Sequence, residues 1–174
     1  MSFHYFYQNQ IVFLFMKKFS IGVLFLFFAT IVNAQEIKKV RIDELKNYIN
    51  QSKKPLVINF WATWCKPCVE ELPYLIAKTK AYANKGVELV LVSLDFEESY
   101  PKDIKSFLKK NNYEAINFWL NETDATEFCP IIDKKWEGTI PVTLMLDNTK
   151  NYRKFYGFSL TPREVEKALK ELVK

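Results

Sequence analysis

Two cysteines, Cys65 and Cys68, stand two residues apart, between a short apolar run and a segment with helical periodicity. Unpaired backbone N–H groups and the helix dipole at a helix N-terminus favour an anion, and a thiolate is such an anion. In motifs of this kind the thiol pKa falls from about 8.5 into the range of about 3.5–7.5. We expect Cys65 to face solvent as the nucleophile and Cys68, one turn inside, to resolve the mixed disulfide. Pro67 is compatible with the first helical turn and would constrain the ring that a Cys65–Cys68 disulfide closes.

A zinc half-site and a static structural disulfide are the alternative interpretations of this pair. Zinc requires about four ligands, usually Cys or His. Residues 35–174 contain three cysteines and no histidine, because the only histidine is His4. A structural disulfide that closes so short a loop would constrain little of the unfolded chain. We therefore favour redox chemistry and expect no metal and no cofactor.

The composition narrows the remaining classes of function. The chain has 174 residues, of which 49% are apolar and 26% charged. About 150 residues per domain is typical, so one domain is expected. The formal net charge of +5 is too small, and its basic residues too mixed with acidic ones, to predict a nucleic-acid groove.

The first 34 residues have a composition of their own, with no acidic residue and many phenylalanines. Lys17-Lys18 precede an uncharged run, 19–34, that ends in Ala34. This order predicts a signal peptide over residues 1–34, cleaved after Ala34, with Met16 as a possible true start. The alternative is an uncleaved membrane anchor, although the run is shorter than the ~20 residues of a spanning helix. We expect export to the periplasm or cell envelope of a bacterium, and an oxidising or actively managed redox environment.

Residues 35–174 alternate between helical and strand patterns, which predicts an α/β domain with a mixed central sheet between helices. Residues 56–94 are expected to form one strand-helix-strand crossover with parallel strands. The expected helices are 41–52, 65–86, 101–111, a short broken helix around Pro130 at 125–135, and a capped helix from Thr161 to the C-terminus. The expected strands are 56–60, 87–94, 115–120 and a hairpin of 141–146 with 151–158.

Residues 60–68, Phe-Trp-Ala-Thr-Trp-Cys-Lys-Pro-Cys, resemble the active-site signature of the thioredoxin superfamily. The resemblance covers about residues 38–173 and implies a thioredoxin-like fold in which Pro141 is a cis-proline facing the dithiol. The strand and helix expected at 115–135 resemble the insertion, before the cis-proline strand, of the TlpA/ResA-like branch. That branch contains exported thiol-disulfide oxidoreductases, including reductases of cytochrome c maturation.

The resemblance also assigns a role to an acidic residue. The TlpA/ResA-like branch carries a glutamate six residues after the first cysteine, where this chain has Glu71, and it helps to move the proton of the buried resolving thiol. Asn59 stands where ordinary thioredoxins have a buried aspartate. A carboxyl group near a buried thiol would have a raised pKa and could accept a proton near neutral pH. The alternative is that Glu71 is a solvated helix residue beside Glu70.

Four further residues are candidates for substrate binding. Trp64 is expected to flank the nucleophile as an apolar rim, the alternative being a partly buried aromatic with no contact role, and Pro67 lies between the cysteines. Ile140 and Pro141 would present a backbone edge to an incoming peptide, with little sequence selectivity. The third thiol, Cys129, is expected to be a buried apolar residue. Trp119 and Trp136 are expected to pack in the core.

The sequence therefore predicts an exported thiol-disulfide oxidoreductase that reduces or exchanges protein disulfides. The expected partners are protein thiols and disulfides and a membrane-bound thiol reductant, and the protein is expected to be a monomer. Strong oxidants of the superfamily commonly carry a histidine next to the second cysteine, where this chain has Pro67, so reduction is favoured. A disulfide-introducing oxidant or isomerase, and a binding module without turnover, are the other hypotheses.

Overall fold

The computed structural model describes residues 36–174, so the predicted signal peptide at 1–34 lies outside the described residues. Within 36–174 no helix is long and apolar enough to cross a membrane. The order of the elements is β1 (Ile37–Val40), α2 (Ile42–Gln51), β2 (Leu56–Trp61), α3 (Lys66–Lys80), β3 (Glu88–Ser93), α4 (Lys102–Lys110), β4 (Ile116–Leu120), α5 (Ala125–Ile132), β5 (Val142–Asp147), β6 (Tyr152–Tyr156) and α6 (Pro162–Leu172).

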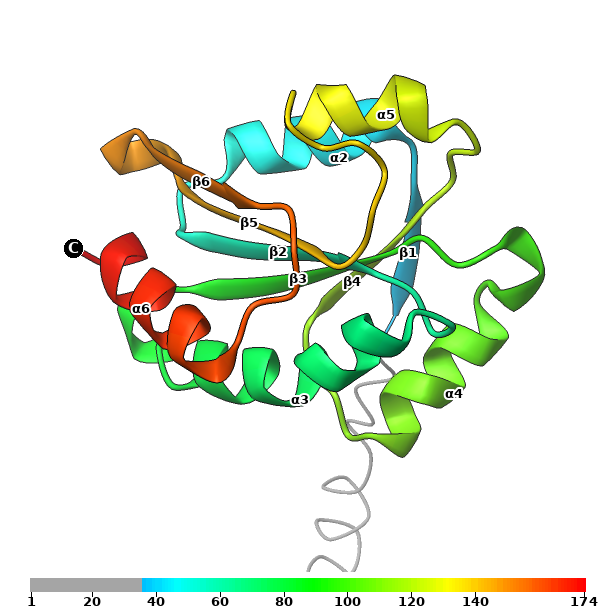
Figure 1. The fold of residues 1–174 in the computed structure, drawn as a ribbon, viewed down its shortest axis with the longest axis horizontal. Coiled ribbons are helices and arrows are strands. Elements are labelled where there is room, and N and C mark those ends of the chain that lie inside the picture. Colours follow the sequence, from blue (N-terminus) through cyan, green and yellow to red (C-terminus); the bar gives the residue numbers. More distant parts are fainter. Residues whose placement is uncertain (1–35) are drawn as a thin grey trace, which may run out of the picture. The chain divides into compact units, whose positions relative to one another are not determined.

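The described strands form one mixed six-stranded sheet in the order β1-β4-β3-β2-β5-β6 (Figure 1). β2 pairs parallel with β3, as the predicted crossover requires, and antiparallel with β5. β5 and β6 form the predicted antiparallel hairpin. The mixed α/β sheet expected from the sequence is confirmed.

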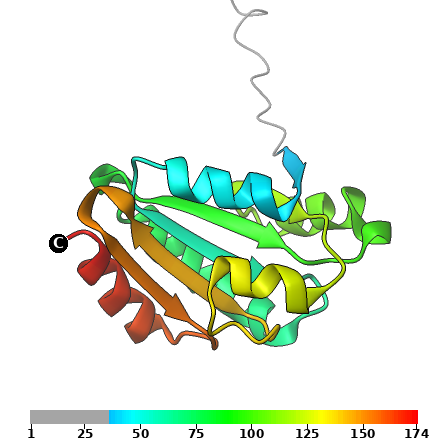
Figure 2. The same ribbon diagram turned by 90° about the horizontal axis from the view of Figure 1, so that it is seen from above.

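The helices cover both faces of this sheet, because neighbouring residues of a strand point to opposite sides. On β2, Ile58 and Phe60 pack with residues of α2 and α5, whereas Trp61 packs with residues of α3 and α4. Val57, on that second face, packs with α6. Figures 1 and 2 show the two layers, with α2 and α5 together on one side of the sheet.

Two local features differ from the expected elements. The edge strand β1 was not anticipated; it pairs parallel with β4. Helix α5 runs without a break through Pro130, so the predicted broken helix is wrong. Asp124 caps its N-terminus, and Phe128 and Ile132 anchor it in the core, which outweighs the backbone hydrogen bond that proline removes.

Helix α6 begins as the sequence predicts. Thr161 accepts a hydrogen bond from the Glu164 backbone N–H, and the Glu164 carboxylate accepts from the Thr161 backbone N–H, which completes a capping box. Leu160, directly before this cap, is fully buried. The start of α6 therefore holds the 157–160 segment in place at the side of the sheet that carries α3.

Candidate active site

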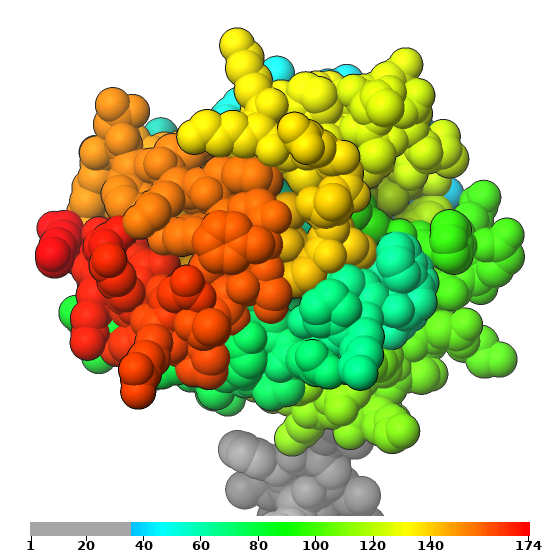
Figure 3. Space-filling view, viewed as in Figure 1, coloured from blue at the N-terminus to red at the C-terminus, as the bar shows by residue number. Residues whose placement is uncertain are grey.

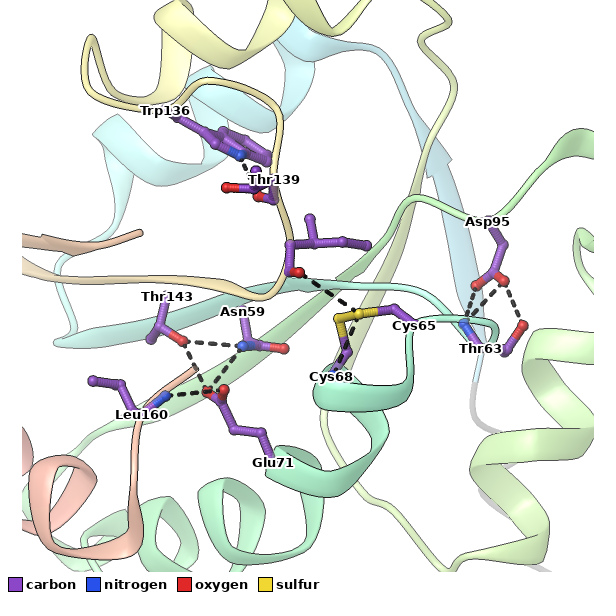
Figure 4. Close-up of a disulfide and its surroundings, with 11 residues drawn as sticks. Asn59, Thr63, Cys65, Cys68, Glu71, Asp95, Trp136, Thr139, Thr143 and Leu160 are labelled. Atoms are coloured by element: carbon purple, nitrogen blue, oxygen red, sulfur yellow. Dashed lines mark hydrogen bonds between the residues drawn. A yellow bond between two sulfur atoms is a disulfide. The ribbon is translucent and has the colours of Figure 1, made fainter. Parts of the chain in front are cut away.

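Cys65 and Cys68 are bonded in a disulfide at the N-terminus of α3 (Figure 4). Cys65 is the N-cap of the helix, and its Sγ accepts a hydrogen bond from the Cys68 backbone N–H at 3.3 Å. Pro67 occupies the second position of the helix and is exposed. Because its missing N–H is one that a helix start leaves unpaired, proline is compatible with this place.

The expectation that Cys65 faces solvent is wrong, because Cys65 has only a small exposed surface. The exposed fraction of Cys65 is 5%, against 0% for Cys68, so both residues are buried and Cys65 is the more accessible. The segment before β5 covers it: the Ile140 carbonyl oxygen lies 3.8 Å from Cys65 Sγ. In the space-filling view this gold segment lies directly beside the teal start of α3 (Figure 3).

The Ile140–Pro141 peptide bond is cis and lies against the disulfide, as the sequence predicts. Pro141 is buried and Ile140 half-buried, so only Ile140 of the two has appreciable exposed surface. The indole N–H of the buried Trp136 donates a hydrogen bond of 2.8 Å to the Thr139 carbonyl oxygen. This contact ties the cis-proline segment to the core. The expectation that Trp136 packs in the core is confirmed.

Glu71 is buried, with 1% of its surface exposed, so the interpretation as a solvated helix residue is wrong. Its carboxylate accepts hydrogen bonds from the Leu160 backbone N–H at 3.2 Å and from Thr143 Oγ1 at 3.4 Å. Asn59 Nδ2 donates to it at 3.5 Å and to Thr143 Oγ1 at 3.0 Å. Figure 4 shows this carboxylate turned toward Asn59 and Leu160 rather than toward the sulfurs.

Burial raises the pKa of the Glu71 carboxyl above that of an ordinary glutamate. Hydrogen bonds from Ser159, Leu160 and Thr143 act in the opposite direction, but none of these partners is a cation. A low-dielectric site disfavours the charged form of an acid, and neutral donors offset this only in part. The neighbouring Glu70 has different surroundings from Glu71, because it is exposed and its carboxylate lies 3.9 Å from Lys66 Nζ.

A second buried carboxylate, not anticipated from the sequence, holds the loop that precedes the disulfide. Asp95 is the second residue after β3, and its carboxylate accepts hydrogen bonds from the Thr63 backbone N–H at 3.0 Å and from Thr63 Oγ1 at 2.5 Å. Ser93 Oγ donates to it at 2.7 Å. Trp119, buried as expected, donates from Nε1 to the Asp95 carbonyl oxygen. The position of Asp95 in the sequence could have indicated this contact. Asp95 and Thr63 each follow one of the parallel neighbours β2 and β3, which end at the same edge of the sheet.

Trp64 lies on the surface, with 55% of it exposed, and its role as an apolar rim for substrates stays a prediction. Its ring stacks on that of Phe96, with centroids 5.8 Å apart and an angle of 19° between the planes. Phe96 is 67% exposed and was not anticipated from the sequence.

Cys129 is buried in the core that α5 contributes to, as expected. Burial raises the pKa of its thiol to about 11, so it is uncharged at neutral pH. Within residues 36–174 no group of three or more His, Cys, Asp and Glu side chains is placed to hold a metal ion.

Comparison with known proteins places this arrangement in a family. The model of the AhpC/TSA family matches residues 27–170. The chain belongs to the AhpC/TSA family. Among AhpC/TSA-like relatives, it is similar to the thiol-disulfide oxidoreductase ResA of Bacillus cereus, 36% identical over 117 residues, which covers 67% of this chain and 59% of that protein. It is also similar to the thioredoxin-like protein YneN of Bacillus subtilis, 30% identical over 122 residues, with 67% and 64% covered. The chain thus spans less than two thirds of the length of these curated relatives.

Solved structures confirm the thioredoxin-like fold of this AhpC/TSA member. A thiol:disulfide interchange protein of the thioredoxin family from Chlorobium tepidum superposes with a TM-score of 0.57 at 19% identity, with 70% of this chain and 81% of that chain covered. StoA from Bacillus subtilis superposes with a TM-score of 0.52 at 24% identity, with 72% and 87% covered. The thioredoxin-like fold that the resemblance of residues 60–68 implies is therefore confirmed.

Proposed function

We propose that this protein is a thiol-disulfide oxidoreductase that reduces or exchanges disulfides of other proteins through Cys65 and Cys68. The observation that carries the proposal is the disulfide at the N-terminus of α3, opposite the cis Ile140–Pro141 bond. The similarity to ResA of Bacillus cereus, named a thiol-disulfide oxidoreductase, supports it. Substrate disulfides must come to Cys65, because Cys68 has no exposed surface.

In the reduced protein the Cys65 thiolate attacks one sulfur of a substrate disulfide. A Cys65–substrate disulfide forms, the substrate S–S bond breaks, and one substrate thiolate leaves. The helix N-terminus and the Cys68 N–H, which donates to Cys65 Sγ, stabilise the attacking thiolate. The Cys68 thiolate then attacks Cys65 Sγ, which releases the second substrate thiolate and restores the Cys65–Cys68 disulfide. The substrate gains two electrons and the protein loses them.

Cys68 must lose its proton before it can attack, and burial disfavours the thiolate form of a cysteine. Glu71 is three residues further along α3 and is buried. Burial raises the pKa of its carboxyl, and a higher pKa makes the carboxylate a better proton acceptor. We assign Glu71 the role of proton acceptor for Cys68, with Asn59, Thr143 and Leu160 as the residues that hold its carboxylate.

Trp64, Pro67, Ile140 and Pro141 are proposed to contact the substrate around Cys65. Trp64 and Pro67 are exposed beside the disulfide, and the cis-proline segment lies across it. Backbone groups of an extended segment can pair with a peptide in the manner of an added strand, with little demand on its sequence.

We further propose that the protein acts as a monomer after export, with residues 1–34 as its signal peptide, in the periplasm or cell envelope. A membrane-bound thiol reductant would return two electrons to the Cys65–Cys68 disulfide after each cycle. The proposal of export rests on the charged, apolar and small-residue order of residues 17–34.

Turnover of insulin disulfides with dithiothreitol as the electron donor tests the proposed activity. We expect the protein to accelerate the reduction and Cys65→Ser to abolish the acceleration, while Cys129→Ser retains it. No acceleration by the wild-type protein would contradict catalysis and leave the binding-module hypothesis. Retained activity in Cys65→Ser would contradict the assigned nucleophile.

A further inference from the structure

Two exposed aromatic side chains, Trp64 and Phe96, lie against each other beside the disulfide; we call them the aromatic platform. They are 55% and 67% exposed and stack with centroids 5.8 Å apart. The other large apolar side chains exposed within residues 36–174 are Ile131 and Phe158. Apolar side chains that gather on a surface, rather than lie singly, are typical of interaction sites.

Hydrogen bonds of the buried Asp95 carboxylate fix the two loops that carry the platform. The buried Asp95 carboxylate binds the backbone N–H and the hydroxyl of Thr63, the residue before Trp64. Phe96, the residue after Asp95, then meets Trp64. Two consecutive residues of one loop thus contact two consecutive residues of the other. A preformed surface of this kind loses little conformational entropy when a ligand binds.

Two charged residues that neighbour the platform, Lys66 and Glu97, each have an oppositely charged partner within 4 Å. Lys66 Nζ, next to the disulfide, lies 3.9 Å from the Glu70 carboxylate. Glu97, next to Phe96, lies 3.8 Å from Lys39 Nζ. The exposed surface of the platform is that of two aromatic rings, so an apolar side chain of a partner fits it better than a charged one.

The occupant follows from the chemistry of the neighbouring cysteine. Trp64 precedes Cys65 in the chain, so a protein segment that forms a disulfide with Cys65 must lie close to the Trp64 ring. A small thiol compound has no chain with which to reach Phe96. The ligand that fits both rings is the segment of a partner protein on either side of its reacting cysteine.

We propose that Phe96 is a specificity-determining residue, which with Trp64 receives an apolar side chain that flanks the reacting cysteine of a partner protein. This inference rests on the proposed function, because it assumes that Cys65 exchanges disulfides with proteins. Asp95 is a positioning residue in this account, since it acts through Thr63 and does not contact the partner.

Two matched peptides test the inference. Each contains one cysteine in a mixed disulfide with 2-nitro-5-thiobenzoate, flanked on both sides by leucine in one peptide and by glutamine in the other. The reduced protein releases the coloured thiol, and the ratio of the two second-order rate constants measures selectivity. Because both rates come from one preparation, the ratio does not depend on the fraction of folded protein. The symmetrical disulfide of 2-nitro-5-thiobenzoate reports the chemistry at Cys65 without a peptide.

We expect the wild-type protein to favour the leucine peptide about fivefold, the scale of one aromatic contact. Phe96→Ala should bring the ratio close to one, and Phe96→Leu should restore part of it. The matched control is Ile131→Ala, an exposed apolar residue on α5, which should keep the wild-type ratio.

Equal ratios in wild type and Phe96→Ala, or no preference in the wild type, would overturn the inference while the proposed function stands. Failure of the wild-type protein to react with the symmetrical disulfide would overturn the proposed function, and the inference with it.

Discussion

At the scale of single residues, three thiols and two neighbouring glutamates have different properties because of their surroundings. Cys65 caps a helix and keeps some exposed surface, Cys68 has none, and Cys129 lies in the core with a pKa raised to about 11. Glu71 is buried without a cation, whereas the neighbouring Glu70 is exposed beside Lys66. Equal residue types are thus expected to react differently.

The first prediction concerns alkylation. With the disulfide reduced, limited iodoacetamide treatment at pH 7 should modify Cys65 first, because it combines the helix N-terminus with the greater exposure. Mass spectrometry of the labelled peptides measures the order. Early labelling of Cys68 or Cys129 would contradict the assigned roles.

The second prediction concerns the proton of Cys68. Glu71→Gln should leave alkylation of Cys65 little changed but slow the release of a trapped Cys65 mixed disulfide, most strongly below neutral pH. Loss of a positioned general base typically costs about 10²–10⁴ in rate, and access of water would reduce this factor. Single-turnover kinetics measures the release.

Glu70→Gln is the control for this prediction, because Glu70 lies outside the buried site and pairs only with Lys66. It should release the mixed disulfide at the wild-type rate. Equal rates in the wild type and both variants would exclude Glu71 as the proton acceptor.

At the scale of elements, the sequence predicted most of what positions the dithiol. Hydrophobic periodicity predicted the β2–α3–β3 crossover, and turn residues predicted the hairpin of β5 and β6. The helix-capping residues at 161–164 predicted the capping box of α6. Strand β1 was not predicted from the sequence, because its pattern, Ile-Lys-Lys-Val, has two exposed lysines between buried ends and no alternation of apolar and polar residues. Its pairing with β4, far along the chain, is decided by the assembled sheet.

The parts of the site that sequence did not reveal are contacts between distant segments. Asp95 and Thr63 are 32 residues apart, and Leu160 and Glu71 are 89 apart. Neither spacing has a local pattern, because each contact exists only when β3 or the start of α6 is packed beside the α3 region. The burial of Glu71 likewise depends on packing that a helical period alone does not show.

The third prediction concerns the loop that Asp95 holds. Asp95→Ala would leave the half-buried Thr63 N–H and the buried Ser93 hydroxyl without their acceptor, and should lower the free energy of unfolding by about 2–4 kcal/mol. Urea denaturation measures it. Glu98→Ala, an exposed acid in the same loop, should change stability by less than about 0.5 kcal/mol. Equal effects would show that the hydrogen bonds of Asp95 contribute little.

At the scale of the whole described domain, the mixed sheet brings together segments from four parts of the chain. The end of β2, the start of α3 and the cis-proline segment before β5 lie around the disulfide, and the 157–160 segment before α6 reaches the Glu71 carboxylate through the Leu160 N–H (Figure 4). This convergence also buries Glu71, so the site affects the stability of the domain as well as its chemistry.

The fourth prediction is a pH dependence of stability. The pKa of Glu71 is raised in the folded state above the value of about 4.3 in the unfolded chain. Protonated Glu71 therefore contributes fully to the stability of the folded state below about pH 4. This stabilisation is lost as pH rises through the pKa of the folded state, because between the two pKa values the folded state binds more protons than the unfolded state. The free energy of unfolding of the oxidised wild type, minus that of Glu71→Gln, should fall as pH rises above about 4.

Each pKa unit of the upward shift corresponds to about 1.4 kcal/mol of this fall. Urea denaturation at a series of pH values measures it, and subtraction of the variant removes the contributions of other groups. A difference that stays flat or rises with pH would contradict the raised pKa of Glu71.

The central claim is that Cys65 and Cys68 are a redox pair that donates electrons to protein disulfides. The reduction potential of this pair, measured by equilibration with glutathione or dithiothreitol buffers, tests it most directly. We predict a value near that of thioredoxin, about −270 mV, because no histidine stabilises the thiolate beside Cys68. A value near about −120 mV, typical of a strong oxidant, would contradict reduction as the function of the pair.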